Sequence, residues 1–441
     1  MSKKYDMQTT VNDFATERVP LDQRKSMINV AIIASGFCIS MSGLFTGAAM
    51  AESLNIKEAF ISAIVGNLIL TVIGGFGGII GTREGLTSSR LAMFSFGKQG
   101  FKLVSLVLAL TMGGWFSVQA GLFGNTINAM LPNAGIISRP AIASFWGAIL
   151  MMLTAIVGIK GLSILSKIAV PAIAICATIG VFAAVNSVGG WSEMLKVSPS
   201  KSFGISTGIV LVVGSFAAGA SAQADISRYS TTSKASLLAT TIGYIIANTF
   251  IILAGYLTTL ATGIGDLPKA MIMLGLGVPA LLVLVLAQWT TNDNNLYTSS
   301  LGLANIIPVN RSYIAIAIGV IGAILGAVGV ANNFTNWLEL LGIGIPPMAG
   351  VIICDYYFIN SMNYSDKKLS ELKNWNWKAI VAWILGIVVG FGVKLGIASL
   401  NSLATALISY FILMKIKGEK QVEKEEENGK KNGNGIDKNS L

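Results

Sequence analysis

The sequence predicts an all-α polytopic membrane protein with twelve transmembrane helices: a five-plus-five inverted-repeat transporter fold with broken helices 1 and 6, plus helices 11 and 12. Three observations predict it: apolar runs of spanning length, Lys and Arg residues gathered on one side, and glycine-rich interruptions in the first and sixth runs. Composition agrees, since 53% of the 441 residues are hydrophobic and only 12% are charged. Soluble globular domains rarely reach this balance.

Apolar runs follow one another along nearly the whole chain, each long enough to cross a bilayer, which takes roughly 17–25 residues. They lie near 27–50, 57–80, 101–130, 140–161, 165–187, 205–224, 236–264, 274–300, 312–330, 333–358, 377–396 and 398–415. The domains expected from them are a cytoplasmic N-terminal tail (1–26), a first five-helix repeat (27–187), a second five-helix repeat (205–358), helices 11 and 12 (377–415) and a disordered cytoplasmic C-terminal tail (416–441).

The distribution of positive charge predicts the orientation in the membrane. Placing both termini in the cytoplasm puts 25 of the 31 Lys and Arg residues on the cytoplasmic side, which is the positive-inside bias. The net charge of +10 therefore reflects topology, and we expect no nucleic-acid partner. The N-terminus is polar and the first apolar run has full spanning length, so we expect no cleavable signal peptide. We expect a monomeric, multi-pass protein of the cell membrane.

The sequence lacks the residues that most enzyme chemistry needs. It has no histidine, which removes the commonest general base and metal ligand. The three cysteines, Cys38, Cys176 and Cys354, each lie inside an apolar run without metal-ligand spacing. Nucleotide-binding and hydrolase motifs are also missing from the sequence. We therefore expect no enzyme activity and no cofactor.

A polar stretch, QWTTNDNN (288–295), continues the eighth apolar run without a break. Helical spacing puts Ala287, Thr290, Thr291 and Asn294 on one face. Because lipid cannot satisfy polar groups, this face must meet protein or a water-filled cavity. Its neutral, oxygen-rich groups suit a weakly held alkali cation and a neutral polar solute. The alternative is that these groups only hydrogen-bond to neighbouring helices.

The first and sixth runs carry the interruptions. They read ASGFCISMSGLFTGAAMAES (34–53) and VVGSFAAGASAQADISRYS (212–230). Glycine and serine at this density lower helix propensity and permit a local break, where unpaired carbonyls can bind a cation and unpaired amides a solute. In the sixth run we expect the break around Phe216, between Gly214 and Gly219. The alternative is close helix packing through small residues.

The third run offers a surface for a flat ring. Trp115 and Gln119 are four residues apart and share a face, and Gly113 and Gly114 leave room for something to approach. An indole stacks on a heterocycle, and an amide supplies a donor and an acceptor to its edge. The alternative for the tryptophan is a place at the membrane interface.

Taken together, the segments GWFSVQAG (114–121), VGSFAAGASAQADISRY (213–229), AQWTTNDN (287–294) and IPPMAGVIICDYY (345–357) resemble the nucleobase-cation-symport-1 family. Within that family the bacterial cytosine permeases are the most similar, over about residues 15–415. The resemblance implies twelve helices, with the first ten in a five-plus-five inverted repeat. It also implies sodium-coupled uptake by alternating access.

The resemblance implies two sets of site residues. Sodium would be bound by backbone carbonyls of Gly36 and Ile39, together with Ala287, Thr290 and Thr291. The residues around the substrate ring would be Trp115 and Phe216 as a stacking sandwich, with Gln119, Ser215, Ala218, Gly219 and Asn292 at its edges.

The chain departs from cytosine permeases at two of these places. Met112 stands where they carry a glutamine, and the glutamine here is Gln119, as in hydantoin transporters. Ala287 stands where they carry an asparagine, again as in hydantoin transporters, and its carbonyl can still bind sodium. We therefore expect a sodium-coupled symporter that imports cytosine or a related nucleobase or hydantoin-like ring.

Three alternatives remain at this point. A proton-coupled permease of the same fold would use Asp293 or Glu339 as its proton site. An amino-acid transporter of the same fold would need groups for a carboxylate and an ammonium, whereas Trp115, Gln119 and Phe216 favour a ring. A membrane receptor or channel would show no concentrative, saturable uptake.

Overall fold

The computed structural model describes residues 17–157, 159–199, 203–304, 306–364 and 371–433. Within these residues the elements are helices, and β pairing is limited to one isolated bridge between Lys25 and Ser230. The predicted all-α fold is therefore confirmed.

The helices follow the predicted runs closely. In the first half they are η1 (Leu21–Gln23), α1 (Met27–Cys38), α2 (Met41–Ala51), α3 (Ile56–Glu84), α4 (Ser88–Phe96), α5 (Phe101–Met130), η2 (Gly135–Ser138), α6 (Pro140–Val157), α7 (Ile159–Ser187) and α8 (Trp191–Met194). In the second half they are α9 (Ile205–Ser221), α10 (Ala224–Ser227), α11 (Ser233–Thr241), η3 (Ile242–Asn248), α12 (Thr249–Thr262), α13 (Leu267–Met273), α14 (Gly277–Ala304), α15 (Arg311–Ala327), η4 (Val330–Asn333), α16 (Phe334–Gly344), α17 (Pro346–Cys354), η5 (Asp355–Ile359), α19 (Trp377–Gly392) and α20 (Ala398–Gly433).

By length and apolar character, six helical segments of the described chain could cross a membrane, or seven if the bent pair α1 and α2 is one span. Four shorter apolar helices add to these: α6, α9, α15 and α19. The remaining long helix, α14, has 28 residues and contains the polar stretch. The count of twelve spans stays a prediction.

The first span is broken as predicted. α1 ends at Cys38, Ile39 and Ser40 leave the helical conformation, and α2 starts at Met41 at an angle of 49° to α1. The sixth span also breaks, but not around Phe216. α9 runs unbroken through Gly214 and Gly219, and the interruption lies at residues 222–223, before α10.

Close packing explains why Gly214 does not break α9. A Cβ at Gly214 would lie 1.8 Å from the carbonyl oxygen of Leu338, so α9 meets α16 backbone to backbone. α2 and α12 are also in close backbone contact at a glycine, because a Cβ at Gly47 would lie 1.9 Å from the carbonyl oxygen of Ile252. At these positions the glycines allow close helix packing, which is the alternative given for the small residues of these runs.

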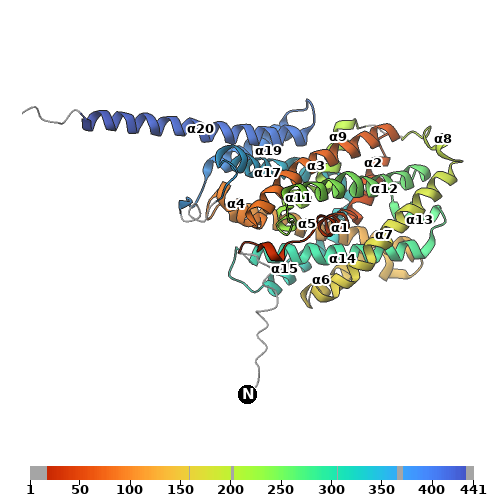
Figure 1. Cartoon of the computed structure of the whole chain (residues 1–441). Coiled ribbons are helices and arrows are strands. Elements are labelled where there is room, and N and C mark those ends of the chain that lie inside the picture. Colours follow the sequence, from red (N-terminus) through yellow and green to blue (C-terminus); the bar gives the residue numbers. More distant parts are fainter. Residues whose placement is uncertain (1–16, 158, 200–202, 305, 365–370, 434–441) are drawn as a thin grey trace, which may run out of the picture.

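The helices pack in pairs that come from distant parts of the sequence. α2 packs on α12 and α3 on α9, while α5 packs on α14 and α6 on α15 (Figure 1). α19 and α20 pack on each other, and α20 also covers α17. Large apolar side chains such as Ile28, Phe182 and Val388 are exposed on the outside of this bundle, as expected for lipid-facing positions.

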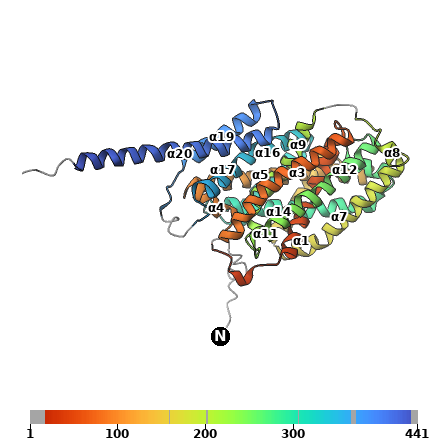
Figure 2. The ribbon, with the colours of Figure 1, turned by 45° about the horizontal axis from the view of Figure 1, so that its top comes forward.

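α20 continues as a helix to Gly433 and projects beyond the bundle (Figure 2). A disordered tail is predicted from residue 416, so the structure differs there. Glu and Lys dominate this segment and are good helix formers, which accounts for the extension. Residues 434–441 of the predicted C-terminal tail, and 1–16 of the N-terminal tail, lie outside the described part of the chain.

Candidate functional site

The break between α1 and α2 frees backbone carbonyls where the predicted sodium site begins. Ile39 has φ −75° and ψ 82°, and its N–H donates to the Ser35 carbonyl at 2.9 Å. In the described chain the carbonyls of Gly36 and Ile39 have no backbone N–H partner, because the next turn is not helical. Unpaired carbonyls at an interrupted span are groups that can bind a cation.

α14 brings three oxygen atoms together. The hydroxyl groups of Thr290 and Thr291 both donate to the carbonyl oxygen of Ala287, each at 2.9 Å. Thr290 is buried and Thr291 is half-buried. α14 also contacts α2, the helix that follows the break. The two threonines therefore present lone pairs beside a carbonyl oxygen, which is a donor set that suits a hard monovalent cation.

The rest of the polar stretch splits between two roles. Gln288 donates to Thr126 on α5 at 3.1 Å, and Asn292 donates to the Phe116 carbonyl at 3.1 Å. For these side chains the interhelical hydrogen-bonding alternative applies. Asn294, in contrast, is exposed although it lies mid-helix. An exposed amide in a span is typical of a water-filled cavity.

Trp115 lies in an aromatic cluster that α16 supplies. Its side chain is 6% exposed, and its ring centroid is 6.1 Å from that of Phe334 and 6.1 Å from that of Trp337, both edge to face. The room expected beside Gly114 is filled, because a Cβ there would lie 2.2 Å from the Trp337 ring. What approaches α5 at this glycine is thus a tryptophan of the same chain.

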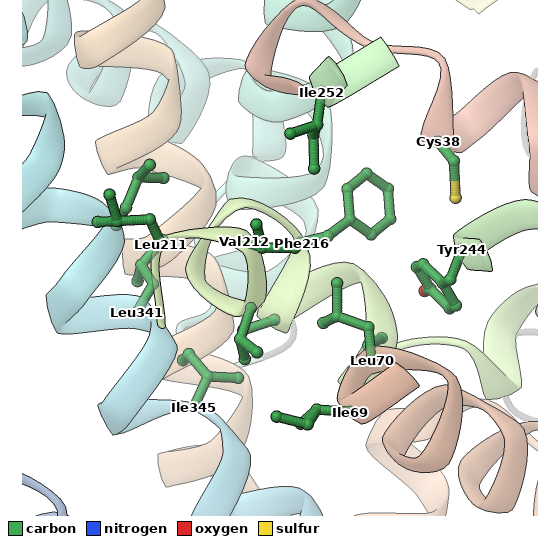
Figure 3. Close-up of a cluster of buried hydrophobic side chains, with 14 of the residues drawn as sticks. Cys38, Ile69, Leu70, Leu211, Val212, Phe216, Tyr244, Ile252, Leu341 and Ile345 are labelled. Carbon is green, nitrogen blue, oxygen red and sulfur yellow. The ribbon is translucent and has the colours of Figure 1, made fainter. Parts of the chain in front are cut away.

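Phe216 projects from α9 into a different aromatic group (Figure 3). Its ring is 5.0 Å from Phe37 of α1 and 5.5 Å from Tyr244 of η3, both edge to face. The Gly219 position lies under the Phe216 ring, at 2.5 Å for an added Cβ. Trp115 and Phe216 therefore contact different aromatic neighbours.

The edge residues of the predicted ring site are deeply placed. Gln119 is 2% exposed, and its Oε1 is buried without a hydrogen-bond partner in the described chain. The Oδ1 of Asn292 is likewise buried without a hydrogen-bond partner in the described chain. Ser215 donates to the Val212 carbonyl at 2.7 Å, and Ala218 is buried beside it. Buried polar atoms without a partner are uncommon in native proteins and call for an explanation.

Asp293 and Glu339, the candidate proton sites, differ in setting. Asp293 is 2% exposed and accepts hydrogen bonds from Thr154 on α6. Glu339 is exposed on α16. A cavity of about 240 Å³ lies elsewhere, among Gly121, Asn125, Ser144 and Asn332, and includes no predicted site residue.

Sequence reasoning missed four aromatic residues that line these clusters. They are Phe37, Tyr244, Phe334 and Trp337. Phe334 and Trp337 are three residues apart, so a shared helical face could have been read from the sequence. The helix that this face meets could not be predicted from the sequence.

Comparison with known proteins gives the family. Residues 18–413 match the family model described as "Permease for cytosine/purines, uracil, thiamine, allantoin". The chain is 34% identical over 417 residues to "Cytosine permease" of Escherichia coli (strain K12), covering 93% of this chain and 96% of that protein.

Solved structures support the same fold at lower identity. Mhp1 in an inward facing conformation matches with a TM-score of 0.81 at 19% identity, covering 91% of this chain and 93% of that one. Mhp1 as a nucleobase-cation-symport-1 family transporter, closed with bromovinylhydantoin bound, matches with 0.75 at 19% identity, covering 92% and 96%. A Na+-coupled sialic acid symporter matches with 0.61 at 15% identity, covering 90% of each chain. The chain belongs to the family of permeases for cytosine/purines, uracil, thiamine and allantoin, the nucleobase-cation-symport-1 transporters.

Proposed function

We propose that the protein is a sodium-coupled symporter of the cell membrane, with both termini cytoplasmic, that imports a flat, neutral nitrogen heterocycle. Cytosine, another nucleobase or a hydantoin-like ring fits this class. The names of the relatives support it: one is a cytosine permease, one is a transporter with bromovinylhydantoin bound, and one is a Na+-coupled symporter.

One observation carries the sodium part of the proposal: two threonine hydroxyls converge on the Ala287 carbonyl at 2.9 Å each. When a cation binds, the hydroxyl protons of Thr290 and Thr291 turn away and all three oxygens face the ion. The free carbonyls of Gly36 and Ile39 would complete the set from the other side. Sodium would then join the interrupted first span to α14.

The ring part rests on Trp115 and Phe216, which are buried in separate aromatic groups. A ring between them would stack on both faces, with Gln119 and Asn292 offering free oxygens and Ser215, Ala218 and Gly219 lying beneath. Met112 stands on the same helix where cytosine permeases carry a glutamine. The edge of the ring is therefore read by Gln119.

Coupling follows if sodium and ring both favour the same state of the transporter, since each then raises the affinity for the other. Moving one positive charge inward is worth about 2.3 kcal/mol per 100 mV, which supports roughly fifty-fold accumulation. The repeats at 27–187 and 205–358 would give the two conformations. Their support is a mirrored pairing: α2 of the first packs on α12 of the second, and α9 of the second packs on α3 of the first.

Uptake of radiolabelled cytosine into proteoliposomes tests the proposal, with and without a sodium gradient. Uracil, hypoxanthine, allantoin and hydantoin serve as competitors. We expect Thr290→Ala combined with Thr291→Ala to raise the sodium concentration for half-maximal uptake about tenfold or more, since about 1.4 kcal/mol corresponds to each factor of ten.

Thr241→Ala is the matched control, because the half-buried Thr241 on α11 makes the same bond to a carbonyl four residues back, at 2.8 Å, yet that bond lies at the surface, outside the proposed site. It should leave the sodium dependence unchanged. If no ring of the panel moves and sodium changes nothing, the proposal is wrong. If a ring other than cytosine moves, the symporter stands and the substrate is that ring.

A further inference from the structure

Two buried polar groups beside Trp115 have no hydrogen-bond partner in the described part of the chain. One is the indole N–H of Trp337, and the other is Oε1 of Gln119. The first can only donate and the second can only accept. They come from different helices, α16 and α5, and both lie next to the ring expected to stack on substrate.

The Trp337 ring is held in place by its packing. It lies against Gly114, where an added Cβ would be 2.2 Å from the ring, and it meets Trp115 at an interplanar angle of 84°. Phe334, one turn earlier on α16, meets Trp115 as well. The indole is therefore fixed against α5, and its N–H cannot simply turn toward solvent.

Leaving a buried donor or acceptor unpaired destabilises a folded protein, and such groups are usually paired. An apolar side chain at this position would carry no such penalty. The retained N–H therefore points to a partner that is present only when the transporter is loaded. The same argument applies to the free oxygen of Gln119, which is 2% exposed.

We propose that Trp337 is a further substrate-selecting residue. Its indole N–H donates to a carbonyl oxygen of the ring, while Gln119 Oε1 accepts from a ring N–H or amino group. This inference rests on the proposed function and narrows it. The transported ring must carry an acceptor and a donor on its edge, as cytosine, uracil and hydantoin do.

The test compares two ligands on purified, sodium-saturated protein. Cytosine carries the carbonyl, and 4-aminopyrimidine lacks this oxygen and the N1–H but keeps the amino group. Trp337→Phe keeps an aromatic ring on α16 and removes the N–H together with the outer indole ring that lies against Gly114, a packing loss that should affect both ligands alike. We expect the variant to bind cytosine about tenfold more weakly, the size expected for one hydrogen bond, and 4-aminopyrimidine within about twofold of wild type.

The ratio of the two affinities does not depend on the folded fraction of the protein. A less stable variant therefore still gives a valid comparison of the two ligands. Trp377→Phe removes an indole from an exposed position on α19 and should change neither affinity. An unchanged cytosine affinity, or an equal loss for both ligands, would overturn the role of Trp337 while leaving the symporter intact. If wild type binds another ring of the panel, that ring and its analogue lacking one carbonyl replace the pair. If wild type binds none, the proposed function fails first.

Discussion

Thr154 of α6 donates its hydroxyl to the Asp293 carboxylate of α14, at 3.0 and 2.9 Å from the two oxygens. The same hydroxyl accepts from the indole N–H of Trp289 at 3.0 Å. Asp293 therefore has a partner on α6, a helix that packs against its own. This arrangement fits a structural role for Asp293, as a hydrogen-bond acceptor between helices, better than a role in proton coupling.

We expect Asp293→Asn to keep sodium-driven uptake. The amide oxygen can still accept from Thr154, so the uptake rate should fall less than about threefold. The measurement is initial uptake at pH 6 and pH 8, with sodium held constant. If the variant loses uptake, or if wild-type uptake follows a pH gradient without sodium, the proton-coupled alternative is correct.

Gly214 tests the contact between α9 and α16. A methyl group there would meet the Leu338 carbonyl at 1.8 Å, so Gly214→Ala must push two helices apart. We expect a loss of about 1–3 kcal/mol, the usual cost of overpacking. The assay is a thermal melt of the detergent-solubilised protein. Gly344→Ala, on α16 itself, adds a methyl where nothing lies within 4 Å and should melt like wild type or slightly higher.

Glu84 joins the N-terminal segment to two other parts of the chain. Its carboxylate accepts from Arg18 at 3.0 Å, from the Tyr356 hydroxyl at 3.0 Å and from the Tyr364 N–H at 3.3 Å. Arg18 also donates to the Tyr364 carbonyl at 2.6 Å. These bonds tie the segment before α1 to the end of α3 and to the residues after η5.

We expect Glu84→Ala to lower the melting temperature more than Glu84→Gln, and Tyr356→Phe to lower it least. Removing the buried carboxylate takes the acceptor from the Tyr356 hydroxyl and the Tyr364 N–H and removes the ion pair with Arg18, whereas Tyr356→Phe removes one hydrogen bond worth about 1 kcal/mol. The Arg18 side chain is 39% exposed, so solvent screens part of the ion pair. Glu193→Gln, in an exposed pair with Lys196, is the control and should have no measurable effect. Equal melting of all four variants would contradict this account.

Gln119→Leu should separate stability from transport. The substitution removes a buried oxygen that lacks a partner in the described structure, so the melting temperature should stay level or rise. Ring uptake should fall by at least about tenfold, because the acceptor for the ring edge is gone. A variant that loses stability and keeps uptake would assign Gln119 a purely structural role.

The sequence by itself determined the class of the protein and the positions of its unusual segments. Apolar runs and the charge bias define a membrane bundle, and the small, polar residues after Gly36 mark the break that the structure has at Ile39 and Ser40. Helical spacing was enough to place Thr290 and Thr291 beside Ala287 and to put Gln119 on the face of Trp115. These relations are local, since periodicity fixes the directions of side chains within one helix.

Only the tertiary structure decided which helix each face meets. It turned Gln288 and Asn292 toward α5 and left Asn294 exposed, and it used Gly214 for packing on Leu338 where the sequence suggests a break. It also brought Trp337 against Trp115, two residues on different helices far apart in the chain. The physical reason is that contacts between distant helices depend on how whole helix surfaces fit together, and no spacing within a single segment contains that information.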